Sequence, residues 1–209
     1  PDIILDTLKD SDRGVRMSAA RLAEPWLKVP GNDAILDQLV LNTRTDDITE
    51  LRQMMLSLGA HTHILTHMAI RSALYNHAEK PYVLDAALSG LAGKELEFLE
   101  LILGERRWRN AKHRSNVIES LADCIFKEGR PSRVGQLIYY TYGRRTQDWQ
   151  RISILRGIAR NKSKGKPIYY DKKPSMLSKL QKSKYPEEAN LANSIDKLFL
   201  WKGKPGVKP

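Results

Sequence analysis

The sequence predicts an all-α fold, an α-α superhelix (α-solenoid) of about five to six helix pairs. The first observation is a recurring helical pattern: when Val15, Leu51 and Val83 are aligned, the copies follow at steps of 36 and 32 residues. Weaker copies follow, with a step of 37 residues from Ile118 to Leu155. The second observation is that no segment alternates polar and apolar residues for long enough to indicate a strand. Helical repeats of this length are typical of stacked helix pairs.

Helix-capping residues and prolines indicate where the predicted helices begin and end. Asp47 and Glu50 have the spacing of a capping box, Gly59 stands where a C-terminal cap is expected, and Pro81 is placed as a first-turn proline. The predicted helices are two within 2–28, then 32–41, 48–59, 62–76, 81–91, 94–103, 111–127, 131–141, 146–160, 174–183 and 186–201. Residues 161–174 are predicted to form a loop because of their Lys, Gly and Pro content.

The expected domain organisation is a single repeat array over residues 1–201. A bend is possible near 105–110, where the sign of the charge changes, and residues 202–209 have the composition of a linker to a following domain. The chain begins at Pro1 rather than Met, so we expect it to be a segment of a longer protein.

The first clear repeat predicts which side chains are buried and which form pairs. Its apolar residues lie at helical spacing and are expected on one buried face. They are Val15, Ala19, Ala20, Leu22 and Ala23. Arg16 and Arg52 occupy equivalent positions in the first two repeats, and both are expected to form ion pairs with neighbouring acidic residues.

Charge is distributed unevenly along the chain. Residues 1–104 hold 10 Lys/Arg and 15 Asp/Glu, a net charge of −5, whereas residues 105–209 hold 25 and 9, a net charge of +16. Such asymmetry indicates that the basic half meets a protein, a membrane surface or a nucleic acid. The alternative is a solvated Lys-rich surface whose acidic complement lies elsewhere in a longer protein. No run approaches the roughly 20 apolar residues that span a bilayer, so membrane insertion is not expected.

The sequence offers no set of residues that supports catalysis, and we predict that this segment is not an enzyme. His63 and His67 share a helical face, but the residue after His63 is Ile64 rather than the Glu of a zinc protease motif. Cys124, the single cysteine, lies among apolar residues and is expected to be a small buried side chain. Asp148 is interpreted as a helix cap. No catalytic residue, metal ligand or cofactor site is predicted.

The best candidate for an interaction surface combines basic and aromatic residues. It comprises Arg106, Arg107, Trp108, Arg109, Tyr139, Tyr140, Arg144, Arg145 and Trp149, with Tyr142 beside them. Arginine and aromatic side chains at this density suit phosphate contact, base stacking or a protein-binding hot spot. The alternative is that the two tryptophans fill gaps between repeats while the arginines face water.

Several motifs together resemble the HEAT-repeat region of large bacterial multidomain proteins. They are the stretch Asp12–Glu24, Leu56-Ser-Leu-Gly59, Asp85-Ala-Ala-Leu-Ser-Gly-Leu91 and Leu198-Phe-Leu-Trp-Lys-Gly-Lys-Pro205. In that family a β-propeller similar to quinoprotein sugar dehydrogenases precedes the repeats, and a c-type cytochrome domain follows them. Lys202 departs from the family pattern, in which proline is more usual. No haem or quinone residue of the family maps onto this segment.

The resemblance implies a HEAT-like scaffold or protein-interaction module, placed as the spacer between a quinoprotein-like dehydrogenase domain and a c-type cytochrome domain. It also implies a periplasmic or exported protein. The partners are then other proteins or flanking domains of the same chain. The alternative is nucleic-acid binding through the basic C-terminal half, as in HEAT-like DNA glycosylases that hold a duplex in a basic groove.

Overall fold

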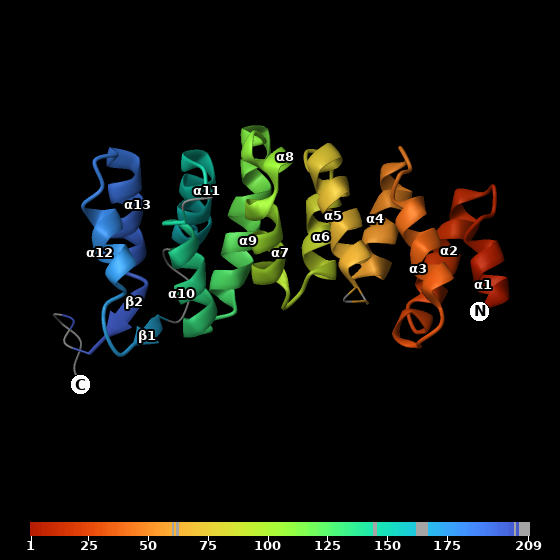
Figure 1. Cartoon of the computed structure of the whole chain (residues 1–209), viewed down its shortest axis with the longest axis horizontal. Helices are drawn as coiled ribbons and strands as arrows, with labels where there is room; N and C mark the ends of the chain where they lie inside the picture. The colour runs from red at the N-terminus through yellow and green to blue at the C-terminus, as the bar shows by residue number, and fades with distance from the viewer. Residues whose placement is uncertain (60, 62, 144–145, 162–166, 203, 205–209) are drawn as a thin grey trace. The chain divides into compact units, whose positions relative to one another are not determined.

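The structure is a computed structural model that describes residues 1–59, 61, 63–143, 146–161, 167–202 and 204. It is predominantly helical, as predicted, with thirteen α-helices in the described residues (Figure 1). The chain divides into two compact units, Pro1–Ala92 (unit 1) and Gly93–Pro209 (unit 2). The segment 105–110 lies inside unit 2.

Unit 1 is built from helices in two layers. Helix α2 packs on α4 and α4 on α6, while α1 packs on α3 and α3 on α5. Within each pair, α1 contacts α2, α3 contacts α4 and α5 contacts α6. Every helix thus contacts its pair mate and the equivalent helix of the next pair. The elements are α1 (Asp2–Thr7), α2 (Arg13–Ala23), the 3-10 helix η1 (Trp26–Lys28), α3 (Asp33–Asn42), α4 (Ile48–Leu58), α5 (Ile64–His77) and α6 (Val83–Gly90).

The helix ends of unit 1 agree with the sequence at Asp47 and Gly59 and differ at Pro81. Only half of the predicted capping box forms, because the Asp47 backbone N–H donates to the Thr45 hydroxyl at 3.2 Å and the Glu50 carboxylate accepts from Arg16. The carboxylate of Asp47 accepts a hydrogen bond from the Glu50 backbone N–H at 2.9 Å, and Gly59 is the C-cap of α4. Pro81, predicted in the first turn of its helix, instead precedes the N-cap Tyr82, whose φ of 60° is left-handed. Because this backbone conformation cannot continue a helix, α6 begins only at Val83.

The buried face of α2 is narrower than predicted. Ala19, Ala20 and Ala23 are buried, but Val15 and Leu22 are 36% and 66% exposed, so their placement on the buried face was wrong. The three alanines allow close approach of neighbouring helices, and the larger aliphatic side chains are left outside the contact.

Unit 2 repeats the layered arrangement. Helices α7, α9, α11 and α13 pack in series, and α10 and α12 lie beside them. The elements are α7 (Glu95–Gly104), α8 (Arg106–Arg109), the 3-10 helix η2 (Lys112–Arg114), α9 (Ser115–Lys127), α10 (Pro131–Tyr140), α11 (Asp148–Ala159), β1 (Ile168–Tyr170), α12 (Ser175–Gln181), α13 (Pro186–Asp196) and β2 (Phe199–Trp201).

Two short strands in unit 2 were not predicted. Ile168 pairs with Phe199 and Tyr170 with Trp201 in a parallel two-stranded sheet. The predicted helix 186–201 therefore ends earlier, and part of the predicted loop 161–174 is a strand. Each strand has three residues, too few for an alternating pattern to be recognised.

Within each unit, side chains bond to residues that lie 32 to 36 positions away along the chain. In unit 1, Arg16 Nε donates to Glu50 at 2.6 Å across 34 residues, and Arg21 Nε to Gln53 at 2.7 Å across 32 residues. In unit 2, Arg133 donates to Glu97 at 2.6 Å across 36 residues. The expected acidic partner of Arg16 is thus confirmed. Arg52 differs, because its guanidinium lies 4.8 Å from the centre of the Tyr82 ring.

Candidate interaction surface

The two tryptophans of the candidate surface take part in the packing of α8 against α11. Trp108 is completely buried, and the indole N–H of Trp149 donates to the Arg109 carbonyl oxygen at 2.8 Å. The Gln150 side-chain amide also reaches the Trp108 carbonyl oxygen, at 3.5 Å. The tryptophans thus join α8 to the first turn of α11, which agrees with the alternative that they fill gaps between repeats. Trp108 offers no ring face to a ligand.

The structure describes three of the five arginines in the predicted surface. Arg106 and Arg107 are exposed on α8, and Arg109 is half-buried. Arg144 and Arg145 lie outside the described residues. In the described part of the chain, the exposed positive charges at this end of unit 2 therefore come from α8 and from lysines that the sequence prediction did not include.

The two neighbouring tyrosines at the end of α10 have different surroundings. Tyr139 is 59% exposed. Tyr140 is half-buried, and its hydroxyl accepts a hydrogen bond from the Gln136 amide at 2.8 Å. Burial, followed by a hydrogen bond with Glu100, raises the pKa of Tyr140 to about 12. Tyr139 therefore belongs to the surface, while Tyr140 packs between helices.

Lysines and a tyrosine from the end of α12 complete this surface and were missed in the sequence. Lys179 Nζ lies 5.7 Å from the centre of the Tyr142 ring, and Lys184 Nζ lies 5.1 Å from that of Tyr185. Tyr142 and Tyr185 are 40% and 48% exposed. The Lys-rich composition of 179–185 was visible in the sequence, but nothing there indicated that it folds back beside residue 142.

A buried carboxylate links α11 to the connection between α12 and α13 through hydrogen bonds. Glu188, only 5% exposed, accepts hydrogen bonds from Arg151 at 3.4 Å and from the Ser183 hydroxyl. The contacts link the start of α11 to the connection between α12 and α13, and Figure 1 shows these segments at the same end of unit 2 as α8. We name this surface the basic tyrosine edge; it comprises Arg106, Arg107, Lys112, Tyr139, Tyr142, Lys179, Lys182, Lys184 and Tyr185.

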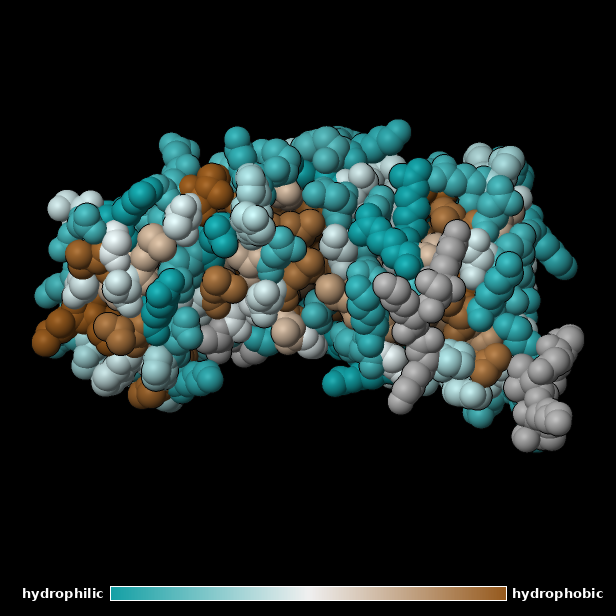
Figure 2. Space-filling view, turned by 180° about the vertical axis from the view of Figure 1, so that it is seen from behind, coloured by the Kyte–Doolittle hydropathy of each residue, from teal (hydrophilic) through white to brown (hydrophobic). Residues whose placement is uncertain are grey.

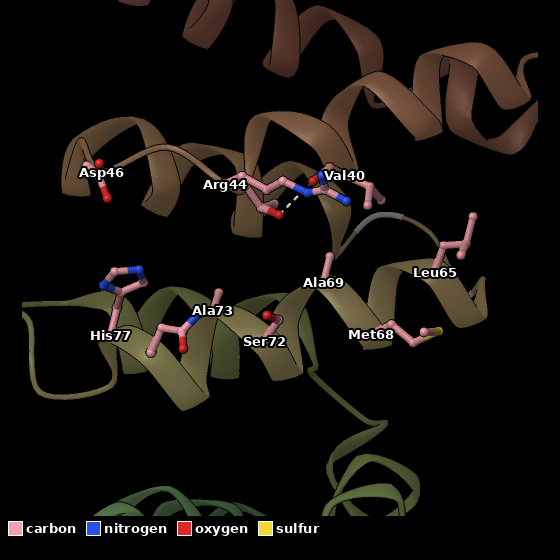
Figure 3. Close-up of a pocket in the computed structure, with 11 residues that line it drawn as sticks. Val40, Arg44, Asp46, Leu65, Met68, Ala69, Ser72, Ala73 and His77 are labelled. Atoms are coloured by element: carbon pink, nitrogen blue, oxygen red, sulfur yellow. Dashed lines mark hydrogen bonds between the residues drawn. The ribbon is translucent and has the colours of Figure 1, made fainter. Parts of the chain in front are cut away.

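Unit 1 carries a different kind of surface, a cleft of about 580 Å³ between α3 and α5 (Figure 3). Figure 3 shows Val40 and Arg44 on one side, with Met68 and His77 at opposite ends of the other side. The full lining is Val40, Thr43, Arg44, Asp46, Leu65, Met68, Ala69, Ser72, Ala73, Asn76 and His77. The lining mixes apolar residues with both signs of charge and therefore does not define one ligand.

The exposed hydrophobic residues also distinguish the units. Figure 2 shows hydrophobic residues exposed at several points over unit 1, to the left in that view. The large hydrophobic residues exposed in the described part of unit 1 are Ile3, Val15, Leu22, Val29, Leu41, Leu56, Ile64, Met68 and Tyr82. In the described part of unit 2 they are all tyrosines, Tyr139, Tyr142, Tyr169 and Tyr185. The large hydrophobic residues exposed on unit 1 are thus mainly aliphatic, with Tyr82 as the exception, whereas unit 2 presents tyrosines, two of which, Tyr142 and Tyr185, lie beside lysines.

The histidine and aspartate candidates have structural contacts. His63 is the N-cap of α5, and its Nδ1 accepts the Leu65 backbone N–H at 3.3 Å. Asp148 is not the cap of α11, because Gln147 is the N-cap and forms a capping box with Gln150. Asp148 lies 3.5 Å from Arg151 instead. Within the residues that the structure describes, no group of three His, Cys, Asp or Glu side chains could hold a metal ion.

Cys124 is half-buried rather than fully buried. Burial is the main cause that raises the pKa of its thiol, and nearby Glu95 adds to the effect. A raised pKa leaves little thiolate at neutral pH, so the side chain is a weak nucleophile.

Comparison with protein-family models, with curated proteins and with solved structures finds no match. Among the described residues, no helix combines the length and the apolar character needed to cross a bilayer.

Proposed function

We propose that the chain is a non-catalytic HEAT-like α-solenoid that serves as a scaffold and protein-interaction module. The observation that carries this proposal is the series of side-chain bonds between residues about one repeat apart. Arg16 with Glu50 supports it in unit 1, and Arg133 with Glu97 supports it in unit 2. In a repeat protein each repeat contacts only its neighbours, so such bonds transmit rigidity along the array.

In a longer protein this scaffold would act as a spacer. The resemblance to the HEAT region of dehydrogenase–cytochrome proteins supports a place between a quinoprotein-like dehydrogenase domain and a c-type cytochrome domain. The redox chemistry would belong to those flanking domains, and this segment would hold them at a fixed separation. A periplasmic or exported location belongs to the same proposal.

A distance measurement between the units tests the spacer role. Spin labels are attached at Ser18→Cys and Asn190→Cys, two exposed helical positions, in a Cys124→Ser background. A rigid spacer gives one narrow distance distribution by double electron–electron resonance. The control pair, Ser18→Cys with Ser72→Cys, lies within unit 1 and reports the width that labels alone produce. A distribution between units much broader than the control would overturn the spacer role.

Nucleic-acid binding through unit 2 is the second candidate function. Residues 93–209 hold 26 Lys/Arg and 12 Asp/Glu, a net charge of +14, which favours a polyanionic partner. Binding to duplex DNA would weaken steeply with salt, because phosphate contacts release condensed counterions. A titration of the purified chain with a short duplex at several salt concentrations tests this candidate, and absence of binding at low salt would remove it.

A further inference from the structure

We propose that the basic tyrosine edge of unit 2 docks an acidic segment of a protein partner. This inference rests on the proposed interaction function and names the chemistry of the partner. Three features of the edge support it: lysines without an ion-pair partner among the described residues, tyrosine rings that lie beside lysines, and connecting segments that hydrogen bonds hold in place.

The cations of the edge divide into those that are neutralised and those that are not. Arg151 beneath the edge lies 3.4 Å from the buried Glu188 and 3.5 Å from Asp148, so its charge is balanced. In the described part of the chain, no carboxylate forms an ion pair with Lys179, Lys182 or Lys184. Three ammonium groups within six residues therefore keep their full charge, and like charges held together favour an anionic partner.

The aromatic rings of the edge favour carboxylates over bases. Single-stranded nucleic acids are bound largely by stacking of bases on free aromatic faces. Here a lysine ammonium group already lies over two of the three exposed rings of the edge, Tyr142 and Tyr185, which leaves Tyr139 for stacking. Trp108 is buried and the Trp149 indole is bonded to the backbone. The edge thus offers cations and phenol hydroxyl donors, which bind carboxylate oxygens through charge-assisted hydrogen bonds.

The edge is also held in place before any partner arrives. The Ser183 hydroxyl donates to Glu188 and accepts from the Tyr185 backbone N–H at 3.2 Å, which fixes the connection between α12 and α13. The bond from Trp149 to the Arg109 carbonyl oxygen fixes α8 against α11. Cations on preorganised segments lose less conformational entropy on binding than cations on a free tail.

The length of the partner segment follows from helix packing. Neighbouring helices lie roughly 8–10 Å apart, and an extended chain advances about 3.3 Å per residue. An edge that runs from α8 past α11 to α13 covers two such spacings, about 16–20 Å, and therefore accommodates an extended segment of about five to six residues.

The test is a titration of the purified chain with a fluorescent polyglutamate peptide of about ten residues, which is long enough to span the edge and extend beyond it at both ends. We expect saturable binding at low salt that is lost at high salt, because exposed charges are screened. The decisive variant is Lys179→Glu/Lys182→Glu/Lys184→Glu, which replaces three exposed ammonium groups of the edge with carboxylates. It should weaken binding by at least about tenfold, since opposed charges at an interface become like charges.

A matched variant separates the edge from the net charge of the unit. Lys172→Glu/Lys197→Glu/Lys202→Glu changes the charge by the same amount at exposed positions near the strands, at the other end of α13. The two variants are compared at about 0.1 M salt, where the Debye length is roughly 10 Å. The matched variant should then change affinity by less than about threefold, because the 11 residues of α13 place roughly 16 Å between its charges and the edge. Far-UV circular dichroism checks that both variants are folded.

Three outcomes overturn the proposal. They are absence of polyglutamate binding at low salt, equal weakening by the two variants, and tighter binding of an oligothymidylate of matched charge, which would instead indicate a nucleic-acid surface. None of these outcomes depends on the distance between the units, so failure here and failure of the spacer role are distinguishable.

Discussion

Gly59 and Gly90 meet backbone to backbone in unit 1. A Cβ atom placed on Gly59 would lie 2.2 Å from the Cα atom of Gly90 and 2.6 Å from its carbonyl oxygen. A Cβ on Gly90 would lie 2.9 Å from the Met55 carbonyl oxygen. These separations are shorter than any non-bonded contact, so the approach of α4 to α6 depends on the absence of side chains at both positions.

The change Gly59→Ala should therefore destabilise unit 1 although alanine favours helices. Forcing atoms into a packed contact typically costs about 1–3 kcal/mol, and here the obstacle is backbone, which cannot rotate away. Chemical denaturation measures the free energy of unfolding. Gly104→Ala is the matched control, because a Cβ there meets nothing within 4 Å. Equal stability of the two variants would show that α4 and α6 do not pack as closely as described.

The pair formed by Arg16 and Glu50 predicts a loss of stability that depends on pH. Arg16 donates to both carboxylate oxygens of Glu50, at 2.6 and 2.8 Å, and the Glu50 side chain is only 2% exposed. Arg16→Met leaves this buried carboxylate without its cation, at a cost of about 3 kcal/mol near neutral pH. Arg13→Met is the control, because Arg13 pairs with Asp47 at a largely exposed position, where an ion pair contributes about 0.5 kcal/mol.

The sign of the pH dependence follows from the pKa of Glu50. The hydrogen bond from Arg16 is the largest cause that lowers this pKa below its ordinary value. The stabilisation is therefore present above the unfolded-state pKa and is lost as the pH falls through the lower folded-state pKa. Urea denaturation at neutral and acidic pH should show the difference between wild type and Arg16→Met shrinking in acid. A difference that grows in acid would contradict the assignment.

The helices of unit 1 could be predicted from sequence because their signals are local. The cap at Asp47 and the helical spacing of Ala19, Ala20 and Ala23 are set by neighbours in the chain, and the structure agrees with them. The short strands could not be predicted, because Ile168 pairs with Phe199, a residue 31 positions further on, over only three residues.

The candidate surface was predicted in part for a related reason. Local basic and aromatic content singled out Arg106 and Tyr139, and both side chains are exposed. Sequence spacing could not distinguish the buried Trp108 from an exposed ring. Nor could it bring Lys179 beside Tyr142, because that contact depends on how α12 returns to the end of α10.

Glu95 provides the opposite case to Glu50. It is 7% exposed, and burial is the largest cause that raises the pKa of its carboxyl above the ordinary value, with Glu128 adding to the effect. A raised carboxyl pKa means that folding is favoured while the group is protonated, and this contribution is lost as the pH rises through the folded-state pKa. Glu95→Gln should therefore increase the free energy of unfolding by about 1 kcal/mol at pH 8.

The same substitution should have little effect near pH 4, where the wild-type carboxyl is itself largely protonated in the folded state. Paired urea denaturation curves at the two pH values measure this. A variant that is less stable than wild type at pH 8 would show that the charged carboxylate is needed where it lies.

Lys204 fixes the end of the described chain against α13. Its ammonium group donates to the carbonyl oxygens of Asp196 and Phe199 at 2.6 and 2.5 Å and lies 4.4 Å from the centre of the Trp201 ring. A cation at the C-terminal end of a helix is stabilised by the unpaired carbonyl groups there.

Lys204→Ala should lower the protection of the Ile168 amide against hydrogen exchange by about tenfold. This amide donates to the Leu198 carbonyl oxygen at 3.0 Å. Lys202→Ala, at a neighbouring exposed position, should leave that protection unchanged. Equal protection in both variants would mean that the sheet of β1 and β2 is held without Lys204.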